Sequence, residues 1–240
     1  MLHGLMIGMR RVMKQLTVDL SVRTPVDQGL SSFRPVMSIK PVACSLLLLL
    51  AFTSAPTLAA DAEKNPLKLV KIANDGTELP DTATLGTKAK DWACTLDRTT
   101  GLIWEVKTTS GLRNHNNSYT WYSSDMAGRA IGAPSGGFCT PDGRCDTEKY
   151  IAEVNSAKLC GASDWRMPQV RELEAHFATR LASPETYAAF YPNTSSTYYW
   201  SGTPGAFYSF SAWAVYVSDA QSYYFHRTGS NGIRAVRKGQ

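Results

Sequence analysis

The amino-acid sequence predicts an α+β fold in which two helices pack on a small antiparallel sheet, with many loops. An alternating segment at Leu67–Ile72 reads as an early strand. Two stretches after residues 146 and 168 carry apolar side chains at three- and four-residue steps, which is the spacing of amphipathic helices. Short aromatic segments after Tyr187 read as further strands. Helices and strands that are grouped along the chain, and do not alternate, are typical of α+β proteins.

The first sixty residues have the features of an export signal. Val42–Phe52 is an apolar run preceded by Lys40, and Thr57–Ala60 supplies small residues for cleavage. The run is shorter than the roughly 20 residues that a membrane-spanning helix needs. We therefore expect 1–36 to be an extension from a mis-called start codon and 37–60 to be a signal peptide. The mature protein is then periplasmic or secreted and has no membrane span.

Removal of 1–60 changes the charge balance of the chain. The segment holds six of the 25 basic and two of the 20 acidic residues, so 19 and 18 remain. A net charge of +1 gives no reason to expect a nucleic-acid partner. All eleven tyrosines and all six tryptophans lie in the remaining part, which suits a surface that contacts sugars.

Four cysteines remain after the signal, and an even number in an exported chain predicts disulfides. Four cysteines allow three pairings. Turn residues between Cys139 and Cys145 favour a bond between these two, which leaves Cys94 to pair with Cys160.

The mature chain divides into an N-terminal strand and linker at 61–91 and a domain at 92–240. The domain opens with a turn at Asp97–Gly101 and a strand at Leu102–Val106. Asp146 or Thr147 caps a first helix that runs to about Leu159.

Gly161 suits the left-handed position after that helix, and Pro168 suits the first turn of the second one. Val170, Leu173 and Phe177 face inward on the second helix. The strands expected after it form an antiparallel meander, and they are Tyr198–Ser201, Ser211–Val217, Ser222–His226 and Ile233–Arg237.

Between the helices, Trp165 lies between two opposite charges, Asp164 and Arg166. We interpret this corner as a polar clamp beside a buried ring, with Arg166 paired to Glu105 or Glu172. The alternative is an enzyme that uses Asp164, Arg166 and Glu172 as an acid–base set. The sequence carries no common catalytic, nucleotide-binding or metal-binding motif, so we expect no cofactor and no metal site.

The C-terminal end is basic and aromatic. No acidic residue follows Asp219. We predict that the residues contacting an extracellular or sulfated polysaccharide are Arg227, Lys238, Tyr223 and His226. Arg227 and Lys238 are expected to be the freer cations.

Five blocks of residues then resemble one bacterial family, the domain at the C-terminus of the collagen-like adhesin Lcl. The blocks are Asp97–Glu105, Cys160–Leu173, Tyr199–Thr203, Ala212–Val215 and Ile233–Arg237. Their signature residues are Asp97, Gly101, Trp104, Glu105, Asp164, Trp165, Arg166, Pro168, Glu172, Trp200, Trp213 and Arg237.

The resemblance implies a C-type-lectin-like fold and, from the adhesin, glycosaminoglycan binding and a trimer. This chain has no Gly-X-Y stalk that would enforce a trimer. We expect a secreted or periplasmic binding module for extracellular polysaccharide. A module that binds another envelope protein is the further alternative.

Overall fold

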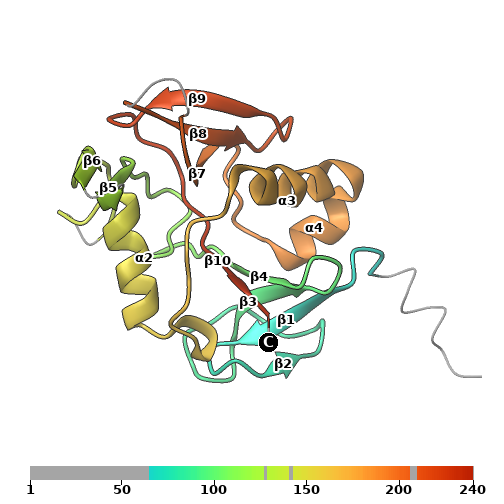
Figure 1. Ribbon diagram of the computed structural model, residues 1–240. Coiled ribbons are helices and arrows are strands. Elements are labelled where there is room, and N and C mark those ends of the chain that lie inside the picture. The colour runs from blue at the N-terminus through green and yellow to red at the C-terminus, as the bar shows by residue number, and fades with distance from the viewer. Residues whose placement is uncertain (1–64, 127–128, 141–142, 206–209, 240) are drawn as a thin grey trace, which may run out of the picture. The chain divides into compact units, whose positions relative to one another are not determined.

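The computed structural model describes residues 65–239, apart from 127–128, 141–142 and 206–209. They belong to one compact unit, Ser54–Gln240. The predicted extension and signal peptide at 1–60 lie outside the described residues. Helices and antiparallel sheets are both present (Figure 1), so the α+β prediction is confirmed.

A five-stranded antiparallel sheet contains both ends of the domain. Its strand order is β10-β4-β3-β1-β2, so the last strand pairs with one from the first half of the chain. The strands are β1 (Leu69–Ala73), β2 (Glu78–Leu79), β3 (Trp92–Asp97), β4 (Leu102–Glu105) and β10 (Val236–Lys238).

A three-stranded meander forms a second sheet, and a hairpin forms a third. The meander has the order β7-β8-β9, and the hairpin pairs β5 with β6. The strands are β5 (Tyr122–Met126), β6 (Arg129–Gly132), β7 (Tyr198–Pro204), β8 (Ser211–Tyr216) and β9 (Ser222–His226).

Helix α2 (Thr147–Ser156) begins where the sequence predicts, because the Asp146 side chain accepts the Lys149 N–H at 2.9 Å. A short 3-10 turn, η1 (Leu159–Gly161), follows, and Gly161 has the predicted left-handed backbone at φ +70°.

Helix α3 (Val170–Ala182) begins just after Pro168, and the Glu172 carboxylate accepts the Gln169 N–H at 2.7 Å as a cap. Helix α4 (Pro184–Phe190) follows directly.

Three expectations about the elements were wrong. The third helix, α4, was not predicted, although the strand expected at Tyr198–Ser201 is present as part of β7. The strand expected at Ile233–Arg237 is shorter and does not continue the meander, because Val236 pairs with Trp104 of β4. The described strands form three separate sheets, and not the single small antiparallel sheet that was expected.

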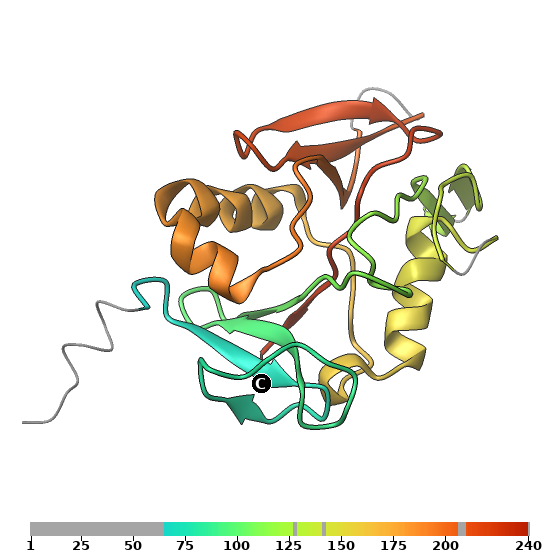
Figure 2. The same ribbon diagram turned by 180° about the vertical axis from the view of Figure 1, so that it is seen from behind.

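Two hydrophobic cores lie on either side of the chain segment that leads into β10. Seen from the front and from behind, α3 and α4 lie between the meander and the five-stranded sheet (Figures 1 and 2). That core contains Trp104, Phe177 and Tyr199. The other core lies beside α2 and contains Trp165, Trp200 and both predicted partners of one disulfide, Cys94 and Cys160.

Both predicted disulfides are present. Cys94 on β3 bonds to Cys160 in the 3-10 turn, and Cys139 bonds to Cys145 across the loop before α2. The first one joins the five-stranded sheet to the segment between α2 and α3.

Candidate functional site

Trp165 is a buried structural side chain, with 3% of its surface exposed. Its indole N–H donates to the Leu159 carbonyl at 2.9 Å. The Asn155 side chain accepts the Trp165 N–H at 2.8 Å and donates to its carbonyl at 3.0 Å. Helix α2 therefore holds the backbone of this residue through Asn155, and η1 holds its ring through Leu159.

The charges that flank Trp165 form two separate ion pairs. Arg166 donates two hydrogen bonds to Glu172, at 2.7 and 2.6 Å. Asp164 pairs with Arg237 of β10 at 2.6 Å. Arg166 is therefore paired with Glu172 and not with Glu105, and the polar clamp is confirmed in its geometry.

The electrostatics of these pairs bear on the acid–base alternative. Burial raises the pKa of Glu172, but the hydrogen bonds from Arg166 and from the Gln169 backbone lower it more, so the pKa lies below its usual value. The hydrogen bond from Arg237 lowers the pKa of Asp164. Neither carboxyl is held protonated near neutral pH, as a general acid must be.

The two pairs also border different cavities. Asp164 and Arg237 line one of about 540 Å³ beside Gly76 and Gly161. Arg166 lines another of about 350 Å³ beside α2. The corner does not converge on one substrate position.

Glu105, Lys107 and Tyr150 form a fully buried polar network that was not predicted from the sequence. Lys107 pairs with Glu105 at 2.8 Å, and the Tyr150 hydroxyl donates to the same carboxylate oxygen. The other oxygen of Glu105 accepts the Ala235 N–H at 2.8 Å. Burial lowers the pKa of Lys107 to about 8 despite the Glu105 charge, which raises it.

Arg234 extends this network to the hydrophobic core that contains Tyr191 and Tyr199. Its guanidinium donates to the Glu105 carbonyl at 3.0 Å and to Thr194 Oγ1 at 2.8 Å. It lies over the rings of Tyr191 and Tyr199. The signature residue Glu105 thus links β4 to the last segment of the chain, through its carbonyl to Arg234 and through its carboxylate to the Ala235 N–H.

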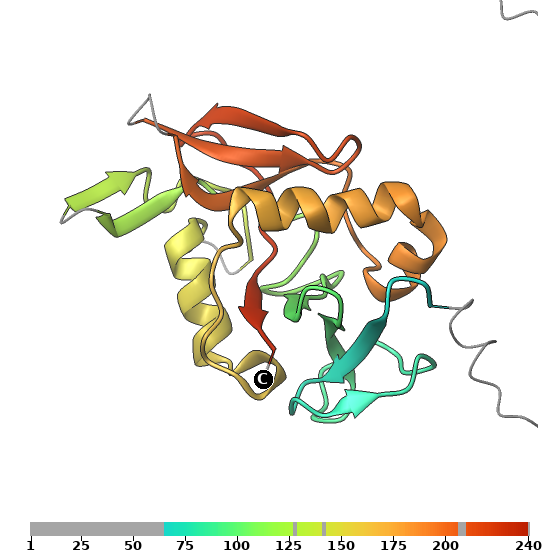
Figure 3. The same cartoon turned by 45° about the vertical axis from the view of Figure 1, so that its right-hand side comes forward.

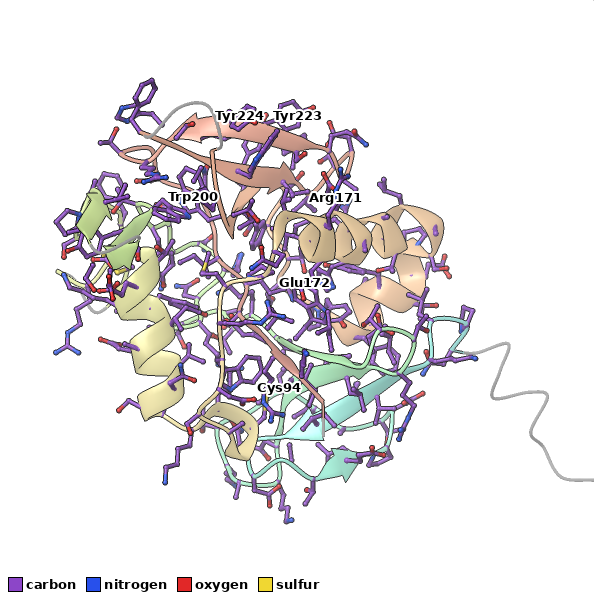
Figure 4. The ribbon with its side chains drawn as sticks, in the orientation of Figure 1. Cys94, Arg171, Glu172, Trp200, Tyr223 and Tyr224 are labelled. Carbon is purple, nitrogen blue, oxygen red and sulfur yellow. A yellow bond between two sulfur atoms is a disulfide. The ribbon has the colours of Figure 1, made fainter. Side chains whose placement is uncertain are left out.

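The meander carries aromatic side chains on its surface. Trp213 of β8 and Tyr224 of β9 are paired across the strands, and their ring centroids are 3.5 Å apart. Tyr223, on the opposite face, packs edge-on against Tyr198 and donates to Asp219 at 2.8 Å. Figure 4 shows Tyr223 and Tyr224 on the outer strand and Trp200 further inside. Tyr223 and Tyr224 are 39% and 41% exposed.

The four residues predicted to contact polysaccharide are not brought together. Tyr223, His226 and Arg227 lie on or next to β9, whereas Lys238 lies in β10 at the other sheet (Figure 1).

The expectation that Arg227 is a free surface cation was wrong. It is 3% exposed, stacks over the Trp121 ring at 4.3 Å and donates to the Ser211 carbonyl. Desolvation lowers its pKa. This burial could not be predicted from local sequence, since the partners of Arg227 come from two other segments, at Trp121 and Ser211.

No group of three or more potential metal-ligating side chains occurs among the residues that the structure describes. In the same part of the chain, no helix is long and apolar enough to cross a membrane.

These features define a disulfide-linked α+β domain with a buried ionic network and an aromatic surface sheet. The model of the Lcl C-terminal domain matches residues 93–237, and the chain belongs to this family. A search of curated proteins finds no match. The resemblance inferred from the five sequence blocks is therefore confirmed.

Proposed function

We propose that this protein is an exported binding module and that the aromatic sheet β7-β8-β9 contacts extracellular polysaccharide. The observation that carries the proposal is the closely packed Trp213–Tyr224 pair on the meander, whose ring planes are tilted by 32°. The face of an aromatic ring is electronegative and the C–H groups of a sugar ring are weakly positive, so the two stack well. Family membership supports a binding module in general.

The charges near this surface favour a contact that depends little on salt. Arg227 is buried, and the charged side chain that hydrogen-bonds to the Tyr223 hydroxyl is the acidic Asp219. A sulfated polymer would need exposed cations and would be released steeply by salt. We therefore favour an uncharged or weakly charged polysaccharide over a sulfated one.

Export and the finer fold class are parts of the same proposal. Two disulfides support an oxidising compartment, the periplasm or the exterior. Helices α3 and α4, which pack between the meander and the five-stranded sheet, support a C-type-lectin-like fold.

Affinity electrophoresis of the purified protein through gels that contain single polysaccharides tests the proposal. We expect retardation, and we expect Trp213→Ala or Tyr224→Ala to weaken the affinity by roughly two- to thirteenfold, because an aromatic contact is worth roughly 0.5–1.5 kcal/mol. Leu181→Ala, an exposed apolar residue of α3, is the matched control.

A screen in which no polysaccharide retards the protein would reject the proposal. Retardation that the two aromatic substitutions leave unchanged would reject the assigned surface. At about 0.5 M salt, charges are screened over a distance on the order of 4 Å. Binding that is restricted to heparin and is abolished at this salt concentration would point to the sulfated class instead.

A further inference from the structure

Among the residues that the structure describes, no strand pairs with β9 on the side away from β8, so β9 is an open edge of the meander. The strand order places β9 outside β8, whereas the other edge of the sheet is covered by Gly232. Gly232 exchanges hydrogen bonds with Trp200 and Tyr198, both at 2.9 Å. In two views of the domain, β9 lies at its outer margin (Figures 1 and 3).

The register fixes which backbone groups of β9 point outward. The ladder runs without a bulge from Ser211↔His226 to Val215↔Ser222. Just beyond its ends, Arg227 donates to Phe210 and Tyr216 donates to Gln221. Alternate residues of an antiparallel strand face opposite edges, so 221, 223, 225 and 227 face β8. Ser222, Tyr224 and His226 therefore direct their N–H and C=O groups away from β8, and the His226 carbonyl already accepts the Gly229 N–H at 2.9 Å.

This edge lacks the features that keep edge strands apart. Its sequence, Ser-Tyr-Tyr-Phe-His, contains no Lys, Arg, Asp, Glu or Pro. Edge strands of soluble proteins are usually protected by charges, by proline or by a bulge, because an unpaired strand is a template for another strand.

We propose that β9 pairs antiparallel with β9 of a second copy of this chain and forms a two-fold symmetric dimer with a continuous six-stranded sheet. Only outward-facing residues can exchange hydrogen bonds, and all three of them find a partner when Tyr224 lies opposite Tyr224 of the second copy. Ser222 then lies opposite His226. Each Tyr224 N–H donates to the Tyr224 carbonyl of the other copy, and each His226 N–H donates to a Ser222 carbonyl.

The side chains and charges fit the same register. Tyr223 meets Phe225 of the second copy on one face, and the two Tyr224 rings meet on the other, so each contact joins aromatic groups. No like charges face each other, since β9 holds none. A second copy is therefore a better match than a charged peptide. The inference does not depend on polysaccharide binding.

A charge-swap experiment tests the register. The protein, expressed from its full sequence and purified, is followed by sedimentation velocity over a concentration series, and we expect a monomer–dimer equilibrium. Tyr224→Lys or Tyr224→Glu alone should raise the dissociation constant by about tenfold or more, because like charges then face each other at the symmetry centre. An equal mixture of the two variants should recover the dimer.

Leu181→Lys, on the surface of α3, is the matched control and should leave the dimer intact. A monomer at all concentrations, a trimer, or a dimer that is indifferent to Tyr224→Lys would overturn the proposal. So would single variants that dissociate but do not recover on mixing.

Hydrogen exchange of the unmodified protein gives a second test that does not depend on how the variants fold. The amides of Tyr224 and His226 should become protected as concentration rises. Those of Tyr223 and Phe225 face β8 and should be protected at every concentration. Equal protection of both sets at low concentration, with no further change, would reject the dimer.

Discussion

Glu105→Ala is expected to be strongly destabilising without affecting any surface site. The carboxylate is fully buried and neutralises Lys107 at 2.8 Å. It also accepts hydrogen bonds from the Tyr150 hydroxyl and the Ala235 N–H. The substitution leaves a buried cation and two buried donors without their acceptor.

The magnitude follows from the loss of one partner of a buried pair. Such a loss usually costs about 3–5 kcal/mol, because the remaining charge is desolvated and uncompensated. Replacing both partners removes that charge, so Glu105→Leu combined with Lys107→Met should be less destabilising than Glu105→Ala alone. The Tyr150 and Ala235 donors remain unsatisfied in the double variant, so recovery should be partial.

Urea unfolding, followed by tryptophan fluorescence with the disulfides intact, measures both effects. With an m-value of about 2 kcal/mol/M, Glu105→Ala should lower the midpoint by roughly 2 M. A midpoint shift that corresponds to less than about 1 kcal/mol would refute the reasoning. A double variant less stable than the single one would also refute it.

Two further predictions concern His176 and the disulfides. Burial and then the Arg234 charge hold the pKa of His176 well below 6.5, so the unfolded chain takes up the proton first. The free energy of unfolding should therefore fall by up to about 1.4 kcal/mol per pH unit as pH drops from 6.5 to 5, and His176→Phe should flatten this slope in urea titrations. Replacing the Cys94–Cys160 pair by alanines should cost about 4 kcal/mol and the Cys139–Cys145 pair about 2, because their loops span 66 and 6 residues. Equal losses in thermal unfolding would contradict this.

Several local features could be predicted because they depend on residues close in sequence. Asp146 caps α2 and Gly161 takes a left-handed backbone, since a side-chain oxygen or a missing Cβ acts within one helical turn. The turn between Cys139 and Cys145 also indicated their disulfide, and the remaining two cysteines then had one partner left.

The position of β10 could not be predicted in the same way. Val236 pairs with Trp104, and alternation within the strand says nothing about which distant strand lies beside it.

The candidate site shows the same limit. The aromatic content of β9 was visible in the sequence, but its pairing with Trp213 required the register of the meander. The basic C-terminal end suggested free cations, yet Arg227 lies over Trp121 and Arg234 lies in the core. A charged side chain is buried only when partners from other segments satisfy it.

The sequence by itself determined the family, the α+β class, the helix starts and the cysteine pairs. Each of these depends on short motifs, capping groups or a small number of combinations. Only the tertiary structure decided that Glu105 and Lys107 form a buried pair, that Arg227 is not free and that β9 is an open edge. The reason is physical: burial and strand pairing depend on contacts between residues far apart in the chain, and the free energy of those contacts has no local signature.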